Sequence, residues 1–166
     1  TGQTNQATFR SDYSVGFWMK ADDTRPAAND YLVGGLESGN SDGFIVYLGT
    51  NGKINVLFKS NGDPLTKRTD AAVVADETPQ AAYMHILAVI ADANPTTITI
   101  YTNGTEEASS VVGGQELSRT NHRLYECNDN TWIGAANANG SGSNFYAGKI
   151  DEYALWSGAL SAAQAA

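Results

Sequence analysis

Short apolar runs follow one another along the whole chain, and turn-forming residues separate them. In the run YSVGFWMK, two kinds of side chain alternate with the period of two that is typical of an extended strand. One face carries Tyr13, Val15, Phe17 and Met19, and the other carries Ser14, Gly16, Trp18 and Lys20. This alternation predicts a β-strand near the start of the chain.

Further strands are predicted at short and regular spacing. The run YMHILAVIAD is long and apolar enough for a central strand. The other candidate strands are DYLVGGL, GFIVYLG, KINVLFK, TTITIYT, TEEASSVV, TWIGAA and FYAGKIDEYALW. Because no helical pattern intervenes, this spacing indicates an antiparallel sandwich rather than alternating strands and helices. The one helix candidate is ALSAAQAA, residues 159–166, with Ser161 as its N-cap.

Asn-Gly pairs predict tight turns between several of these strands. The pair occurs four times, beginning at Asn51, Asn61, Asn103 and Asn139. Asn-Gly readily supplies the positive φ angles that two-residue hairpin turns require. We therefore expect one hairpin over residues 43–59 and a second over residues 96–112. Without a linker run or an internal repeat, residues 1–166 are predicted to form a single domain.

Composition and charge remove several classes of function. Charged residues make up 17% of the chain, with 10 basic against 18 acidic residues and a formal net charge of −8. The densest basic stretch is Lys67-Arg68, which is too small to neutralise nucleic-acid phosphates or bind anionic lipid. No apolar run approaches the roughly 20 residues of a membrane span, and the first ten residues show no secretory-leader pattern. The single cysteine, Cys127, excludes an intrachain disulfide and a cysteine-based zinc site.

Five segments carry a family resemblance in their order along the chain. They are YSVGFWMKA, YMHILAVIAD, ITIYTNGT, TWIGAAN and FYAGKIDEYALWSGALSAAQ. Together they extend from about Tyr13 to Gln164 and resemble laminin-G-like domains of the concanavalin A-like lectin and glucanase superfamily. The last segment is the most specific. The resemblance implies an all-β, two-sheet antiparallel jelly-roll sandwich with a short C-terminal helical turn.

Two departures from the family pattern bear on the ends of the chain and on one strand. Tyr83 stands where the family usually has Trp. The acidic first strand that usually opens the family does not precede the segment TGQTNQATF. We therefore expect the chain to be a portion of a longer polypeptide that lacks its usual first strand.

A glycosidase active site is not supported by the acidic residues. Retaining hydrolysis needs two carboxyl groups about 5–5.5 Å apart, as when acids two or four positions apart share one face of a strand. The chain has no such motif, and its adjacent acids, for example Asp22-Asp23 and Glu106-Glu107, point to opposite faces of a strand. His85 fits a hydrogen-bonded structural role in its apolar strand, and no nucleophile accompanies His122. We therefore predict that the domain is not an enzyme.

Calcium is a candidate ion because irregular loops here offer carboxylate and amide oxygens. The resemblance supports this, since many relatives bind a structural or ligand-bridging calcium. Solvated turn residues that form Asx-turns explain the same loops equally well. The candidate ligands are Glu37, Asp42, Asn128, Asp129 and Asp151.

Sugar recognition needs an aromatic platform and nearby amide or carboxylate groups. The polar loop over residues 137–144 is flanked by Trp132 and by Phe145-Tyr146, which fits this requirement. The alternative is that the tryptophans Trp18, Trp132 and Trp156 belong to the core, as their strand patterns favour. Tyr47 is a further candidate aromatic residue. The candidate sugar-binding residues are Trp132, Asn137, Asn139, Asn144, Tyr146 and Tyr31.

These observations favour a non-catalytic recognition module that binds a glycan or a protein partner through rim loops or a concave sheet. We expect it to act outside the cell, on a cell surface or on a virion surface, and not to bind nucleic acid or insert into membranes. An alternative is an architectural domain of a virion, fibre or decoration protein that associates with copies of itself or a larger assembly, because an incomplete sandwich leaves an unpaired edge. A glycosidase is a more remote alternative.

Overall fold

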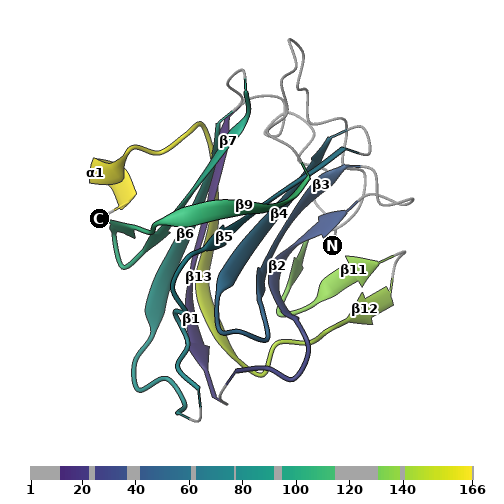
Figure 1. Ribbon diagram of the computed structural model, residues 1–166, viewed down its shortest axis with the longest axis vertical. Helices are drawn as coiled ribbons and strands as arrows, with labels where there is room; N and C mark the ends of the chain where they lie inside the picture. Colours follow the sequence, from purple (N-terminus) through teal and green to yellow (C-terminus); the bar gives the residue numbers. More distant parts are fainter. Residues whose placement is uncertain are drawn as a thin grey trace.

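The computed structural model describes residues 12–22, 25–36, 42–60, 63–76, 78–91, 95–114, 131–138 and 141–165. Within these ranges the chain forms two antiparallel sheets packed face to face, with a small hairpin beside one of them (Figure 1). The all-β sandwich expected from the sequence is therefore confirmed. No helix in the described ranges is long and apolar enough to cross a bilayer.

The five-stranded sheet has the order β13-β1-β6-β7-β8. Its first two strands come from opposite ends of the described chain, and they pair over almost their whole length. The bounds of its strands are β1 (Tyr13–Ala21), β6 (Met84–Ala91), β7 (Thr97–Thr102), β8 (Thr105–Glu106) and β13 (Gly148–Ser157).

The six-stranded sheet has the order β10-β2-β3-β4-β5-β9, and the hairpin β11-β12 lies outside both sheets. Sequential strands are neighbours from β2 to β5, which follows from the short turns between them. The bounds are β2 (Asp30–Leu36), β3 (Gly43–Leu48), β4 (Ile54–Ser60), β5 (Asp63–Thr69), β9 (Ser109–Gly114), β10 (Trp132–Ile133), β11 (Ala136–Ala138) and β12 (Ser141–Ser143).

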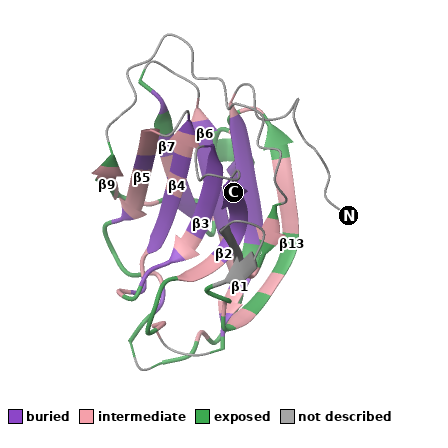
Figure 2. Cartoon of the chain, turned by 90° about the vertical axis from the view of Figure 1, so that its right-hand side faces the viewer, coloured by how far each residue is buried: buried purple, intermediate pink, exposed green. Residues whose placement is uncertain are grey.

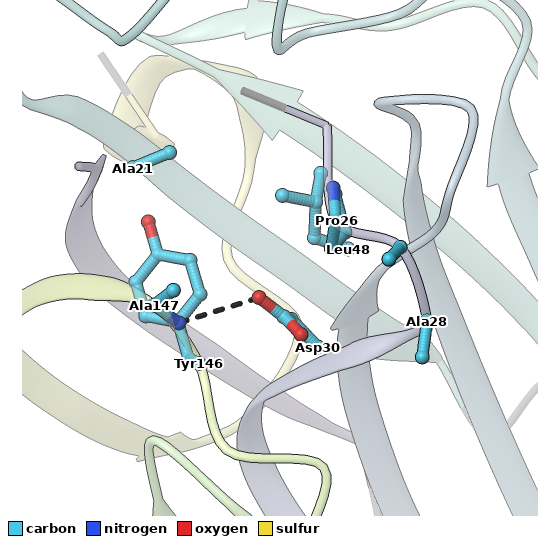
Figure 3. Close-up of a pocket in the computed structure, with 8 residues that line it drawn as sticks. Ala21, Pro26, Ala28, Asp30, Leu48, Tyr146 and Ala147 are labelled. Atoms are coloured by element: carbon cyan, nitrogen blue, oxygen red, sulfur yellow. Dashed lines mark hydrogen bonds between the residues drawn. The ribbon is translucent and has the colours of Figure 1, made fainter. Parts of the chain in front are cut away.

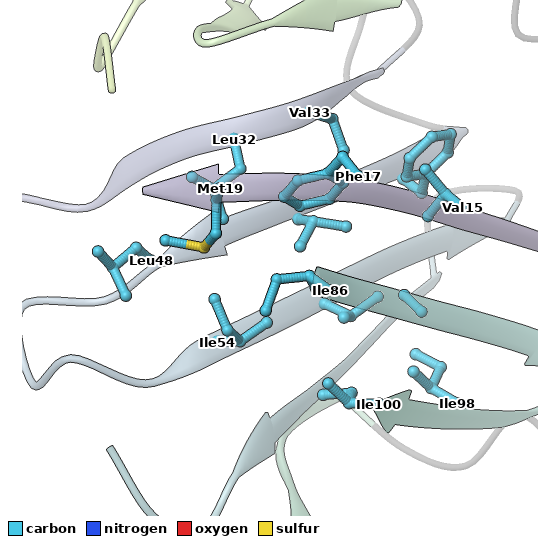
Figure 4. Close-up of a cluster of buried hydrophobic side chains, with 14 of the residues drawn as sticks. Val15, Phe17, Met19, Leu32, Val33, Leu48, Ile54, Ile86, Ile98 and Ile100 are labelled. Atoms are coloured by element: carbon cyan, nitrogen blue, oxygen red, sulfur yellow. The ribbon is translucent and has the colours of Figure 1, made fainter. Parts of the chain in front are cut away.

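The core lies between the sheets and is built by alternation. On β1, the side chains of Tyr13, Val15, Phe17 and Met19 are fully buried, as the sequence pattern predicted. Leu32, Leu48 and Ile54 meet them from the six-stranded sheet (Figure 4). Burying each such side chain contributes roughly 1.5–3 kcal/mol, so this shared layer holds the two sheets together. Figure 2 shows buried residues concentrated along the inner strands, whereas β13 carries exposed and intermediate positions.

The two predicted hairpins have different outcomes. β3 and β4 pair as expected around a turn in which Gly52 has φ 72°. The second hairpin turns at Asn103 and Gly104, both at positive φ, but its return strand β8 ends at Glu106. The chain then crosses to the other sheet, where β9 pairs with β5. The prediction of one continuous hairpin to residue 112 is therefore wrong in its second half.

The C-terminal helical turn α1 (Ala162–Ala165) covers part of the outer face of the five-stranded sheet. Ala165 and Leu160 pack on Leu87, Val89 and Tyr101, which form a small second cluster. The Gln164 side chain accepts from the main-chain N–H of Ser161 at 3.0 Å, so the helix starts where the sequence placed its N-cap.

Candidate functional site

Four side chains from four neighbouring strands form a line on the outer face of the six-stranded sheet. Tyr31 on β2 pairs with Tyr47 on β3, Tyr47 pairs with Asn55 on β4, and Asn55 pairs with Arg68 on β5. Directly opposed residues of antiparallel strands share one face, with Cβ atoms about 4.5–5.5 Å apart. Since the next residue on β3, Leu48, is in the core, this line faces outward. We refer to these four residues as the Tyr–Arg row.

The two tyrosines form an aromatic surface at one end of the row. Their ring centroids are 5.5 Å apart and the ring planes are inclined by 30°. Burial and the neighbouring Tyr31 raise the pKa of Tyr47, whereas the positive charge of Arg68 lowers it. The effect of Arg68 shows that its guanidinium lies near the Tyr47 phenol. The Tyr47 phenol therefore stays neutral at physiological pH and can donate or accept hydrogen bonds.

Arg68 gives the other end of the row a positive charge. Its side chain is half-buried, and within the described part of the chain no carboxylate lies within ion-pair distance of it. The nearby Asp70 carboxylate instead accepts from the Ser110 hydroxyl at 2.7 Å. A guanidinium has five donors in a planar fork that matches a carboxylate. The row is thus suited to an anionic group, although the chain as a whole has a net charge of −8.

Asn55 places an amide between the aromatic and the charged ends. Its Nδ2 donates to the main-chain oxygen of Lys53 at 3.0 Å. This bond orients the amide and leaves its Oδ1 as an acceptor. The row therefore offers aromatic faces, phenolic hydroxyls and a guanidinium, and the Asn55 amide between them is buried, with 4% of the residue exposed.

An apolar row runs beside the Tyr–Arg row on the same face. Trp132 on β10 pairs with Gly34, and Gly34 pairs with Ile45 on β3, which pairs with Leu57 on β4. The Trp132 side chain is half-buried, and its buried indole N–H has no hydrogen-bond partner in the described structure. Trp132, predicted as a sugar contact and alternatively as core, thus belongs by register to this outer face.

The segment before β13 brings two more predicted residues to the edge of this face. The main-chain oxygen of Asn144 accepts from the Tyr31 N–H at 3.0 Å, and Phe145 forms a parallel bridge with Tyr31. The Phe145 side chain is 67% exposed. Tyr31, Asn144 and Trp132, which are far apart in the sequence, are therefore neighbours of one sheet edge.

Tyr146 occupies a different place from the other predicted sugar contacts. Its ring packs against the core and lines a pocket of about 210 Å³ together with Asp30, Pro26 and Leu48 (Figure 3). Burial, with the Asp22 and Asp30 carboxylates, raises the pKa of the Tyr146 phenol. Its buried hydroxyl has no hydrogen-bond partner in the described structure. This pocket lies at one end of the sandwich, and its Asp30 carboxylate accepts from the Ala147 N–H at 3.3 Å.

The remaining predicted sites are only partly covered by the described residues. Asn137 pairs with Gly142 in the β11-β12 hairpin, and Asn139 lies outside the described residues. Glu37, Asn128 and Asp129 also lie outside them. Asp42 is buried at the start of β3, whereas Asp151 is exposed on β13 of the other sheet. Across the ranges that the structure describes, no three His, Cys, Asp or Glu side chains are placed to hold a metal ion together.

Sequence reasoning missed Asn55 and Arg68 as members of a site. Arg68 was weighed only as part of a basic stretch too small for nucleic acid. Alternation could have identified Asn55, because its strand carries the buried apolar residues Val56 and Phe58. It could not have identified Arg68, since the inward neighbours Lys67 and Thr69 are polar. What the sequence did not contain was the register that sets them beside Tyr47.

The chain belongs to the concanavalin A-like lectin/glucanases superfamily, whose laminin-G-type family model matches residues 1–166. No curated protein matches the chain in sequence.

Solved structures share its fold at low sequence identity. The CBM40 of the Ruminococcus gnavus IT-sialidase bound to α2,3-sialyllactose has a TM-score of 0.70 and 17% identity, over 98% of this chain and 89% of that chain. The NanB sialidase of Streptococcus pneumoniae has a TM-score of 0.66 and 24% identity, over 91% of this chain but only 23% of the sialidase. A heptameric SAP-like pentraxin of Limulus polyphemus has a TM-score of 0.64 and 15% identity, over 94% of this chain and 68% of the pentraxin chain. These likenesses establish the fold.

Proposed function

We propose that this member of the concanavalin A-like superfamily is a non-catalytic glycan-binding module that holds an acidic sugar on the Tyr–Arg row. The single observation that carries the proposal is the placement of Arg68, without a carboxylate partner in the described structure, in one row with Asn55 and Tyr47. A sugar carboxylate would pair with the guanidinium of Arg68. The apolar side of the same sugar would lie on the tyrosine rings.

Physical chemistry favours this division of the row. Charge-assisted hydrogen bonds from arginine to a carboxylate are roughly twice as strong as neutral ones and are often bidentate. Aromatic rings next to such a pair exclude water, and their hydroxyls remain free to bond sugar hydroxyls. The likeness to a CBM40 bound to sialyllactose supports a sugar that carries a carboxylate. The proposal goes beyond that likeness because it names the residues of this chain that would bind.

The composition of the two rows supports binding rather than hydrolysis. Neither the Tyr–Arg row nor the row that begins at Trp132 contains Asp or Glu. Glycoside hydrolysis generally requires two carboxyl groups, about 5–5.5 Å apart for retention or about 6.5–9.5 Å apart for inversion. We therefore expect a sugar bound on this face to be released without hydrolysis. Such a module would act where glycans are displayed, outside the cell or on a cell or virion surface.

The decisive test compares 3′-sialyllactose with lactose, which lacks the carboxylate, by isothermal titration calorimetry. We expect the protein to prefer sialyllactose and Arg68→Ala to weaken that binding about 10- to 100-fold, since a hydrogen-bonded charged group contributes about 1.5–3 kcal/mol. Lys149→Ala is the matched control, because it removes a cation from β13 in the opposite sheet and should leave the affinity unchanged.

Two outcomes would contradict the proposal: binding to neither sugar, or equal binding of both with no effect of Arg68→Ala. Repeating the titration with a chelator tests the calcium prediction separately. A loss of binding in chelator that added calcium restores would support a bridging ion. Unchanged binding in chelator would mean that Arg68 anchors the sugar without a bridging ion.

A further inference from the structure

The outer face of the five-stranded sheet carries two tryptophans that the sequence pattern assigned mainly to the core. Trp18 on β1 is 36% exposed and Trp156 on β13 is 37% exposed, so that interpretation is wrong for both. Their register explains the exposure. Trp18 alternates with the core residues Phe17 and Met19, and Trp156 pairs with Ser14, which lies on the same outer face. We refer to Trp18, Trp156, His85 and Glu152 as the indole strip.

Gly16 lets the Trp156 indole approach strand β1 closely. A Cβ atom at Gly16 would lie 3.0 Å from Cζ3 of Trp156 and 3.3 Å from Cδ1 of Leu87. The six-membered ring of the indole thus lies close to Gly16, while the side chain as a whole stays partly exposed. Gly16 and Trp18 are two residues apart on one strand, which is about 7 Å. The two indoles therefore form adjacent platforms.

Two polar side chains border these platforms. The His85 ring lies 5.2 Å from the Trp18 ring, centroid to centroid, at an inclination of 46°. Burial lowers the pKa of His85, and the negative charge of Glu152 opposes that shift, so the carboxylate lies near the imidazole. Glu152 projects from an irregularity in the β1-β13 pairing and has φ 50°. Neither side chain has a hydrogen-bond partner within the described residues.

Another part of this outer face is covered by the C-terminal segment. Ala165 and Leu160 cover Leu87, Val89 and Tyr101, and the Ser14 hydroxyl is bonded to the Gly158 oxygen at 2.9 Å. The C-terminal segment therefore covers the apolar residues on one side of Trp156 but leaves both indoles partly open to solvent. Exposed aromatic groups next to unpaired hydrogen-bonding groups are typical of a ligand site rather than of a covered core.

We propose that the indole strip is a second carbohydrate-binding site, which takes an uncharged pyranose chain. The apolar C–H faces of two sugar rings would lie on the two indoles. The Glu152 carboxylate would accept hydrogen bonds from hydroxyls, and the neutral imidazole of His85 can both donate and accept. The negative charge of Glu152, with Asp151 beside it, opposes the acidic sugar that suits Arg68.

A sugar fits this strip better than a protein partner does. A stable protein interface buries about 800 Å² on each partner and generally has an apolar centre with a polar rim. Here two partly exposed indoles alternate with ionisable groups, which gives a small amphipathic surface. Because the strip and the Tyr–Arg row lie on opposite outer faces, one molecule could link two glycan chains, and the two sites would strengthen attachment to a mixed surface.

The test uses three neutral hexasaccharides as probes: cellohexaose, xylohexaose and mannohexaose. We expect at least one of them, at millimolar concentration, to change tryptophan fluorescence and to give a calorimetric isotherm. Trp156→Ala should weaken that binding at least about tenfold, which corresponds to about 1.4 kcal/mol, and Trp156→Tyr should restore part of it. Val112→Ala is the matched control, since it truncates an exposed apolar side chain on β9 of the other sheet.

Further variants separate this proposal from the first one and from a folding defect. Glu152→Gln keeps the shape of an exposed side chain, so its expected few-fold loss of affinity cannot be ascribed to unfolding. Arg68→Ala should leave hexasaccharide binding unchanged, even if the acidic-sugar proposal fails. Binding of none of the three hexasaccharides would overturn the proposal. Self-association in sedimentation experiments that Trp156→Ala abolishes would also overturn it, in favour of protein docking.

Discussion

The two outer faces of this sandwich differ although one rule builds both. In each sheet, alternate side chains enter the shared core and the others point away from it. On the six-stranded sheet the outward side chains form the Tyr–Arg row, in which a guanidinium and an amide stand beside phenol rings. On the five-stranded sheet they include Leu87, Val89 and Tyr101, on which the C-terminal segment packs, and the indole strip, whose tryptophans stay partly exposed.

The difference shows that residues in the core and residues on the outer faces are under separate constraints. Core positions are fixed by burial, so their identity is limited to apolar residues that pack. Outward positions are limited only by solubility and by cross-strand neighbours. The outer faces are therefore where two different chemistries can be carried on one folding unit, and substitutions can separate them.

The largest expected effect comes from breaking the layer that both faces share. Phe17→Ala removes a fully buried ring and should lower the free energy of unfolding by about 3–5 kcal/mol. The adjacent Trp18→Ala removes an outward, partly exposed ring and should cost about 1–2 kcal/mol. Urea denaturation of the two variants measures this contrast between neighbours in sequence. Equal losses would show that the two faces of β1 are not energetically distinct.

A glycine from each outer face gives a sharper comparison with a smaller effect. Gly16→Val places carbon atoms against the Trp156 indole, whose atoms are only 3.0–3.1 Å from an added Cβ, and should cost about 1–3 kcal/mol. Gly113→Val on β9 meets only Thr66 atoms, at 3.5–3.6 Å from the Cβ, and should be nearly neutral. Thermal unfolding measures the cost, and a red shift of tryptophan emission would report that the indole has lifted from β1. An unshifted spectrum in Gly16→Val would contradict the close contact between Trp156 and Gly16.

The smallest effect is a pH dependence confined to the five-stranded face. Burial lowers the pKa of His85 below its ordinary value of 6.5, so the unfolded chain takes up a proton at higher pH than the folded chain does. The free energy of unfolding should therefore fall as the pH drops through about 6.5 and should level off below the folded-state pKa. Above that window, where His85 is neutral in both states, it contributes no slope.

Two substitutions check the sign of this pH dependence. His85→Asn should flatten the fall relative to the unmodified protein, since it removes the titrating group. Glu152→Gln should make the loss of stability at low pH larger. The negative charge of Glu152 opposes the lowering of the His85 pKa, and the substitution removes that charge. Unfolding midpoints across this pH range measure both changes, and a flatter profile for Glu152→Gln would contradict the assigned proximity of the two groups.

Local patterns in the sequence were sufficient to predict an all-β sandwich. Alternation on β1 identified the four core residues, and Asn-Gly at residue 51 identified the turn between β3 and β4. The prediction went wrong after Glu106, because nothing local distinguishes a return strand from one that crosses to the other sheet. That crossing depends on β5, whose residues lie about forty positions earlier in the chain.

The candidate site was less accessible to sequence reasoning for a related reason. The aromatic members Tyr31 and Trp132 could be named because residue type suggests their role. Asn55 and Arg68 could not, since an amide and a guanidinium on strands are ordinary solvent-facing residues until register places them beside an aromatic ring. Trp18 and Trp156 were assigned to the core because they are hydrophobic, although the alternation of side chains along their strands places them on the outer face.

The pairing of β1 with β13 has a consequence for how the chain reaches this state. Ser14 and Gly158, joined by a hydrogen bond, are 144 residues apart, and the other neighbour of β1 is β6. Contacts this distant in sequence slow folding, because loop closure must precede the contacts that reward it. During synthesis, β1 leaves the ribosome long before β6 and β13, so both of its edges stay unpaired until those strands emerge. The five-stranded sheet can therefore be completed only after β13 has been made, although its central strand β1 is the first described strand of the chain.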